Sequence, residues 1–230
     1  MSYITKEKLY SCVHRLKAMQ FFDPDCYGID AVSYVSFIGV SIMELPFKTK
    51  GLRGMAVPGE KGQPDIILLN KWRTEHEQNV DCTHEIMHLS FHSNMRKKTF
   101  NCFEKITANQ DPFIEWQANE GAAEYLVPYR VFVPMVCEQY SELSGYNIFM
   151  FQSYCREMGD VFRVPPTVID YRLRNLRYEI YQHMNGRSID EIELASNREL
   201  ERRKIHVQSI PDIVIENQTL EDDEFAKLWD

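Results

Sequence analysis

Two histidines and a glutamate lie within the five-residue segment His84–His88. Residues four positions apart project from one face of an α-helix, about 6 Å apart along its axis, so the imidazoles of His84 and His88 can reach one metal ion. Glu85 follows the first histidine and can accept a proton from a metal-bound water. This spacing is typical of zinc hydrolases, whose site requires one further protein ligand and keeps a position open for water.

The missing third ligand can come from a downstream helix that carries Glu115, Glu120 and Glu124. Glu115 and Glu120 point about 140° apart on a helix, so they are not interchangeable. His92 is a competing candidate, but it lies about 12 Å from His84 along a straight helix, too far for one ion with bonds of roughly 2.0–2.1 Å. We therefore expect a glutamate as the third ligand and His92 at the helix end or at the rim of the site.

Capping patterns predict the two helices that position these residues. Thr74 and Glu77 form a Ser/Thr-x-x-Glu capping box, so one helix begins there and carries both histidines. Asp111 and Pro112 supply an N-cap and a first-turn proline for the glutamate-bearing helix. Residues 97–110, between these helices, are interpreted as a loop.

The fold class predicted from the remaining pattern is α+β, with a small, mostly antiparallel sheet packed against these helices and a helical C-terminal region. The expected strands are separated by good turn sequences, and they are Val40–Phe47, Leu52–Val57 and Ile66–Leu69. The expected helical segments are Thr5–Gln20, Val131–Leu143, Ile148–Val161, Pro166–Arg177 and Ile189–Lys204, and a further apolar segment spans Ile29–Ile38.

Composition excludes several classes of protein. Among 230 residues, 44% are hydrophobic and 12% aromatic, which suffices for a buried core. The net charge of −8 argues against broad binding to nucleic acid or anionic membranes, although residues 216–230 hold six acidic residues against one lysine. No stretch is long and apolar enough for a membrane span, and no leader is evident at the N-terminus. The six scattered cysteines are expected to be reduced thiols in the cytoplasm.

Three segments resemble the ImmA/IrrE family of metallo-endopeptidases: the apolar run Ile66–Asn70 that ends in Asn, the His84–His88 segment, and the Glu-x-x-Ala-Asn pattern within Glu115–Pro128. The resemblance covers about residues 30–178. It implies a gluzincin-like fold, a single Zn²⁺ bound by His84, His88 and Glu115, and Glu85 as the catalytic base. Residues 162–176 are similar to the family's helix-turn-helix-like segment.

The resemblance also implies a function: a zinc metallo-endopeptidase that cleaves a helix-turn-helix transcriptional repressor at one site, in a phage, mobile-element or stress-response setting. An alternative is a non-cleaving, toxin-like binding module that docks a transcription factor or antitoxin. The intact Glu85 favours the enzyme. Direct DNA contact by Arg172, Arg174 and Arg177 is disfavoured, because residues 151–205 are close to neutral.

The expected domains are a zinc metallopeptidase domain over residues 1–145, a helical region over 146–205 and an acidic tail over 206–230, which we expect to be flexible or loosely packed. Asn119, one turn after Glu115, is a candidate partner for the free ring nitrogen of a histidine ligand. Candidates for stabilising the oxyanion are Tyr125, Tyr129, His76 and Arg73.

Two positions depart from the family pattern close to the site. Met87 stands where the family usually has Gly before the second histidine, and Gly121 stands where it usually has Phe. Neither is a predicted ligand or the base, so we expect them to affect packing and the substrate pocket rather than metal chemistry.

Overall fold

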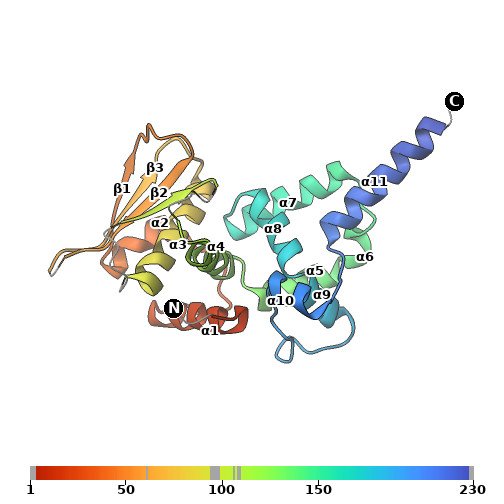
Figure 1. Cartoon of the computed structure of the whole chain (residues 1–230), viewed down its shortest axis with the longest axis horizontal. Helices are drawn as coiled ribbons and strands as arrows, with labels where there is room; N and C mark the ends of the chain where they lie inside the picture. The colour runs from red at the N-terminus through yellow and green to blue at the C-terminus, as the bar shows by residue number, and fades with distance from the viewer. Residues whose placement is uncertain (1–3, 61, 94–98, 106, 108–109, 228–230) are drawn as a thin grey trace. The chain divides into compact units, whose positions relative to one another are not determined.

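The computed structural model describes residues 4–60, 62–93, 99–105, 107 and 110–227, and Figure 1 gives the course of the chain. The chain divides into two compact units. The metal-site unit comprises residues 9–126 and 162–164, and the helical unit comprises residues 1–8, 127–161 and 165–230. The predicted domain boundaries at 145 and 205 stay a prediction.

A four-stranded sheet lies in the metal-site unit, with strand order β1-β3-β2-β4. β1 (Ser41–Leu45) and β3 (Ile66–Asn70) are parallel, whereas β2 (Leu52–Val57) is antiparallel to β3 and to β4 (Phe100–Phe103). The α+β fold with a mostly antiparallel sheet is thus confirmed. The fourth strand was not predicted, because it lies in the segment that we interpreted as a loop.

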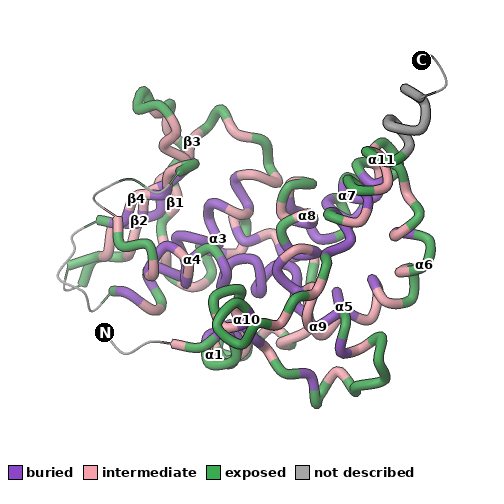
Figure 2. The backbone as a smooth tube through the Cα atoms, turned by 45° about the vertical axis from the view of Figure 1, so that its right-hand side comes forward, coloured by how far each residue is buried: buried purple, intermediate pink, exposed green. Residues whose placement is uncertain are grey.

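Helix α3 (Glu75–His92) packs on the sheet, and α4 (Pro112–Leu126) packs on α3. Figure 1 shows the sheet, α3 and α4 in succession, with α1 (Lys6–Met19) following α4. Every residue from Asp81 to Leu89 is buried, and α3 and α4 are largely purple in Figure 2. Helix α3, which carries His84 and His88, therefore lies in the core of its unit.

Both helices begin where the sequence predicts. Thr74 Oγ1 accepts a hydrogen bond from the backbone N–H of Glu77 at 3.3 Å, and the Thr74 N–H donates to the Glu77 carboxylate at 2.9 Å, which completes the capping box. At α4, Asp111 Oδ1 accepts from the N–H of Phe113 at 2.9 Å. These local contacts fix the start, and hence the rotational register, of each helix.

The apolar segment after α1 forms α2 (Ala31–Tyr34) and a 3₁₀ turn, η1 (Val35–Ile38). Asn79 of α3 ties this segment down: its Oδ1 accepts from the N–H of Ala31 at 2.8 Å, and its Nδ2 donates to the carbonyl of Ile29 at 2.9 Å. The side of α3 away from the histidines is therefore anchored by a buried amide.

The helical unit contains α5 (Tyr129–Glu138), α6 (Tyr140–Leu143), α7 (Ile148–Phe162), α8 (Pro166–Asn175), α9 (Arg177–Met184), α10 (Asn197–Arg203) and α11 (Ile210–Lys227). The helix predicted from Ile189 begins only at Asn197, and the predicted acidic tail is helical as far as Lys227. No helix in the described ranges is long and apolar enough to cross a membrane.

Candidate metal centre

The side chains of His84, His88 and Glu115 converge between α3 and α4. Nε2 of His84 lies 3.0 Å from Nε2 of His88, and Glu115 Oε2 lies 3.4 Å from the first nitrogen and 3.7 Å from the second. All three residues are buried. The structure therefore brings together the three groups that the sequence analysis proposed as ligands.

This triangle suits a tetrahedral metal ion. Bonds of roughly 2.0–2.1 Å separate neighbouring tetrahedral ligand atoms by about 3.3 Å, close to the three observed separations. Two imidazoles and one carboxylate are also the donor set of many catalytic zinc sites. The residues present therefore fit Zn²⁺.

The site favours the protonation states that bind metal. Burial lowers the pKa of His88 to about 4, which keeps its ring neutral at physiological pH. Burial works against ionisation of Glu115, but its contacts with His84 and His88 outweigh burial and hold its pKa at about 2. A neutral imidazole and an ionised carboxylate are the forms that coordinate zinc.

Glu85 is fully buried beside this cluster. Neither of its carboxylate oxygens hydrogen-bonds to any group in the part of the chain that the structure describes. Burial raises its pKa well above the ordinary range for a glutamate. A buried polar group without a partner is costly and calls for an explanation, and a reacting water or substrate is a direct one.

Gly54 of β2 leaves the room that Glu85 occupies. A Cβ atom at this position would lie 3.2 Å from Glu85 Oε1 and 3.4 Å from the carbonyl oxygen of Leu68. The strand is irregular here, with a shift of register against β4 between Leu52 and Gly54. The absence of a side chain at Gly54 thus allows the sheet to approach the Glu85 carboxylate closely.

Asn119 takes the position expected of it. Its Oδ1 lies 3.0 Å from Nδ1 of His84 and can accept the proton on that nitrogen. With Nδ1 protonated, Nε2 of His84 presents its lone pair towards His88 and Glu115.

His92 is the last residue of α3, so the expected position at the helix end is correct, whereas the alternative position at the rim is not. It is buried, with 3% of its surface exposed, and its Nδ1 lies 3.0 Å from Nδ1 of His88. On its other side, Nε2 lies 3.2 Å from Oε1 of Gln117. His92 therefore contacts the far side of the His88 ring and not the point shared by His84, His88 and Glu115.

Glu120 and Glu124 do not join the cluster. Glu120 accepts a short hydrogen bond from the hydroxyl of Tyr10, and Glu124 Oε1 lies 2.9 Å from Nε2 of His14. Both partners belong to α1. Of the three glutamates proposed from sequence, only Glu115 faces the histidines.

Cys102 is a neighbour of the site that the sequence analysis missed. Its Sγ, a ring nitrogen of His84 and an oxygen of Glu85 lie within 4.8 Å of one another. Burial raises the pKa of this thiol to about 12. Since β4 was not predicted, no feature of the sequence placed Cys102 beside Glu85.

Two of the candidates for stabilising an oxyanion have other partners. Arg73 pairs with Asp81 and, at 3.5 Å, with Glu77. The hydroxyl of Tyr125 donates to Gln20 Oε1 at 2.6 Å inside the core. Neither group is therefore poised for this role.

The two departures from the family pattern meet across the interface of α3 and α4. A Cβ at Gly121 would lie 3.0 Å from Sδ of Met87, so the long side chain fills the space above the glycine. Met87 is fully buried. The unusual residue on one helix thus occupies volume that the unusual residue on the other helix leaves.

The arginines considered for DNA contact bind protein groups in the helical unit. Arg172 is fully buried and donates to the carbonyl of Val127 at 2.7 Å. Arg174 pairs with Asp170 at 3.0 Å, and Arg177 donates to the carbonyl of Arg174 at 2.8 Å. These contacts use the arginines within the helix packing.

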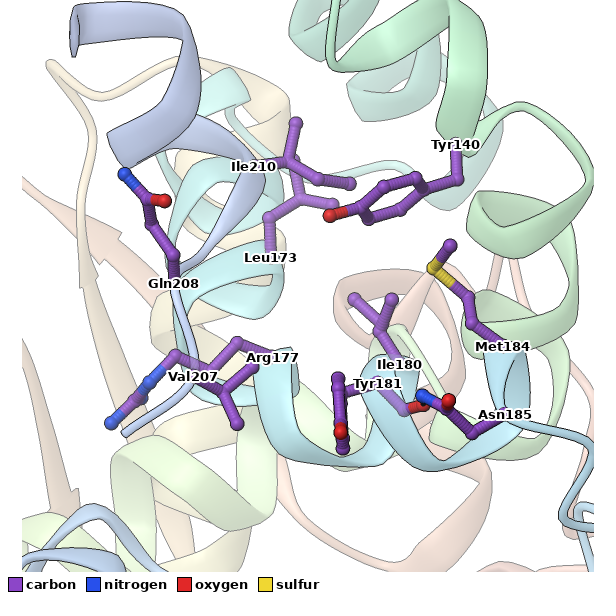
Figure 3. A pocket seen from close by; sticks show the side chains of 10 residues that line it. All are labelled: Tyr140, Leu173, Arg177, Ile180, Tyr181, Met184, Asn185, Val207, Gln208 and Ile210. Atoms are coloured by element: carbon purple, nitrogen blue, oxygen red, sulfur yellow. Dashed lines mark hydrogen bonds between the residues drawn. The ribbon is translucent and has the colours of Figure 1, made fainter. Parts of the chain in front are cut away.

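A separate pocket of about 250 Å³ belongs to the helical unit (Figure 3). Its lining is mainly apolar and includes none of the predicted catalytic or metal-binding residues. The residues around it are Tyr140, Leu173, Arg177, Ile180, Tyr181, Met184, Asn185, Val207, Gln208 and Ile210.

Comparison with known families gives one match. Residues 37–174, more than half of the chain, match the family model Peptidase_M78, described as the IrrE N-terminal-like domain. The matched region contains β1 to β4 and both helices that form the cluster. No curated protein matches the chain.

Proposed function

We propose that this chain, which belongs to the Peptidase_M78 family of IrrE N-terminal-like domains, is a zinc endopeptidase that cleaves a helix-turn-helix transcriptional repressor at one site. Its membership makes it a metallopeptidase. Beyond that membership, the proposal assigns one Zn²⁺ to His84, His88 and Glu115 and the role of general base to Glu85.

The observation that carries the proposal is the ligand triangle together with the partnerless carboxylate beside it. Ligand atoms separated by 3.0, 3.4 and 3.7 Å leave a fourth direction open. Glu85 lies next to this cluster with both oxygens unpaired among the described residues. A purely structural site has four protein ligands and needs no neighbouring base, so the arrangement supports catalysis.

The roles of the protein groups follow from this geometry. When bound, Zn²⁺ supplies positive charge that lowers the pKa of a coordinated water to about 7 and polarises the scissile carbonyl. Glu85 accepts the proton of the attacking water and delivers it to the leaving amine. Its raised pKa makes it a stronger base than an exposed glutamate. Asn119 holds His84 in the tautomer that presents Nε2 to the site.

Edge strand β4 supports an endopeptidase. β4 is at one end of the strand order, and Phe100 within it stacks on the ring of His88 with 4.7 Å between centroids. An extended peptide can add to such an edge through its backbone, without a free terminus. An internal segment of a protein substrate can therefore reach the site.

The substrate class comes from the family resemblance. A regulatory protease of this kind acts on one partner, and a repressor substrate would place the enzyme in the cytoplasm. For a first test, the candidate substrate is any helix-turn-helix regulator that is encoded next to this gene.

The test is co-expression of that helix-turn-helix protein with the wild-type chain or with Glu85→Gln. We expect a discrete fragment, located by mass spectrometry, only with the wild type, while both proteins bind one equivalent of zinc. Complex formation without any fragment would favour the non-cleaving binding module. A fragment that appears equally with Glu85→Gln would exclude Glu85 as the base.

A further inference from the structure

His92 follows the two histidines of the cluster at the same four-residue spacing, and its ring contacts His88 rather than the shared point. We infer that His92 is a positioning residue that holds His88 in its metal-binding tautomer, with Gln117 holding His92 in turn. This inference rests on the proposed zinc site, because it concerns how one of the proposed ligands is prepared.

The hydrogen bonds from His88 through His92 to Gln117 are compatible with one another. To bind metal through Nε2, His88 must carry its proton on Nδ1. That Nδ1–H can donate to Nδ1 of His92, 3.0 Å away, provided that His92 is protonated on Nε2. The Nε2–H of His92 can then donate to Oε1 of Gln117, 3.2 Å away. One set of tautomers satisfies each step.

The surroundings restrict alternatives to this arrangement. His88, His92 and Gln117 are all buried, so water does not readily replace a lost acceptor. The stacking of Phe100 on His88, with 13° between the ring planes, limits rotation of that ring. If residue 92 offered no acceptor, the Nδ1–H of His88 would become a buried donor without that partner, which costs free energy.

The same helix orients both histidine ligands. Asn119 contacts His84 directly at 3.0 Å, whereas Gln117 acts on His88 through His92. Glu115, one turn before Asn119, faces the Nε2 atoms of both rings. Helix α4 thus provides the third ligand and the outer support of the other two, which leaves only the Nε2 lone pairs directed at the shared point.

The experiment compares zinc affinity in four full-length proteins, measured by competition with a chromophoric chelator. His92→Phe keeps the ring shape but removes the acceptor, and His92→Asn restores an oxygen near the position of Nδ1. His206→Phe, at an exposed histidine of the helical unit, is the control for loss of one imidazole. We expect His92→Phe to weaken zinc binding roughly 10–100-fold, His92→Asn to recover most of this loss, and His206→Phe to match the wild type.

A second readout is independent of zinc. Nitrogen-15 NMR of the metal-free protein reports which ring nitrogen of His88 carries the proton, and we expect Nδ1 in the wild type and a mixture of tautomers in His92→Phe. If His92→Phe does not fold, Gln117→Met gives the same test through a smaller decrease in zinc affinity.

Two results would overturn the role of His92: unchanged zinc affinity and tautomer in His92→Phe, or an equal loss in His92→Phe and His92→Asn, which would indicate packing alone. These results differ from failure of the proposed function, in which the wild type itself binds no zinc or binds it independently of His84.

Discussion

Helix α4 presents buried glutamates to two sides, and the two sides differ in how those carboxylates are satisfied. Towards α1, Glu120 and Glu124 each have a near partner, the hydroxyl of Tyr10 and the imidazole of His14. Towards α3, Glu115 shares its Oε2 with two imidazole nitrogens that also lie 3.0 Å from each other. A single residue type therefore occupies two different environments on one helix.

This difference distinguishes glutamates that join two helices from a glutamate that belongs to the candidate metal site. A carboxylate paired with one donor is a satisfied buried group, and its role is to join α4 to α1. On the other side, three potential acceptors lie within 3.0–3.7 Å of one another, and both histidines direct their Nδ1 atoms at other groups. Such a cluster is consistent with a metal site.

The largest effect is expected from Glu115→Gln. This change keeps the side-chain shape but removes the anionic ligand, so zinc affinity should fall by more than the roughly 100-fold typical of outer-shell changes, and cleavage should be lost. Zinc competition and urea unfolding of the metal-free protein test this. A variant that retained wild-type zinc affinity would remove Glu115 from the ligand set.

The cluster between α3 and α4 should also make the stability of the metal-free protein sensitive to pH. Because the pKa of His88 is about 4 in the folded protein and 6.5 as a free side chain, the unfolded chain alone binds this proton between these values. Stability should therefore fall by about 3 kcal/mol as pH decreases from 6.5 to 4. The contribution of Glu115, with a pKa of about 2 against 4.5, is lost in a separate window below pH 4.5.

Urea unfolding at several pH values measures this slope. The matched control is His88→Phe, which lacks the titrating group and should lose that part of the dependence. Identical slopes in the two metal-free proteins would show that His88 does not carry the effect.

Glu124→Gln makes the same chemical change on the other side of α4. It weakens the contact with His14, so we expect a loss of about 1–3 kcal/mol in the free energy of unfolding and no change in zinc affinity. Together with Glu115→Gln, this variant tests whether the two sides of α4 affect stability and zinc affinity separately. Weaker zinc binding in Glu124→Gln would mean that the two sides of the helix are coupled.

The smallest effect is expected at Gly54, which lies against the proposed base, Glu85, rather than against a proposed ligand. The added methyl group of Gly54→Ala would press on Glu85 Oε1, so kcat should fall about tenfold, against roughly 100-fold for a 1 Å misplacement. Zinc affinity should stay at the wild-type value. Gly145→Ala is the control, because its Cβ would meet nothing closer than 3.5 Å. Full activity in Gly54→Ala would show that Glu85 tolerates the displacement.

Sequence alone located the catalytic helices because their signals are local. The capping box at Thr74 and the Asp111-Pro112 start fix where α3 and α4 begin, and the helical repeat then sets which residues share a face. His84, His88 and Glu85 could be proposed for that reason, whereas Glu115 was chosen over Glu120 and Glu124 through the family resemblance. The partnership of Asn119 with His84 follows from the same repeat, one turn after Glu115.

What could not be predicted depends on contacts distant in sequence. β4 is only four residues long and has no extended alternation, so its pairing with β2, and with it the approach of Cys102 to Glu85, is not visible locally. The contact between His92 and Gln117 spans two helices whose relative rotation is set by packing. The sequence therefore allowed His92 to be compared only with the metal ligands along its own helix, and it gave no indication of Gln117.

The contact between Met87 and Gly121 bears on how this protein could be modified. The family pattern places a small residue on α3 and a large one on α4, and this chain inverts both sizes. Restoring Phe at 121 alone would force it into Met87, whereas restoring Gly at 87 alone would leave a void beside Gly121. The two positions are therefore coupled through packing, and a segment exchanged between this chain and one with the family pattern should carry both residues together.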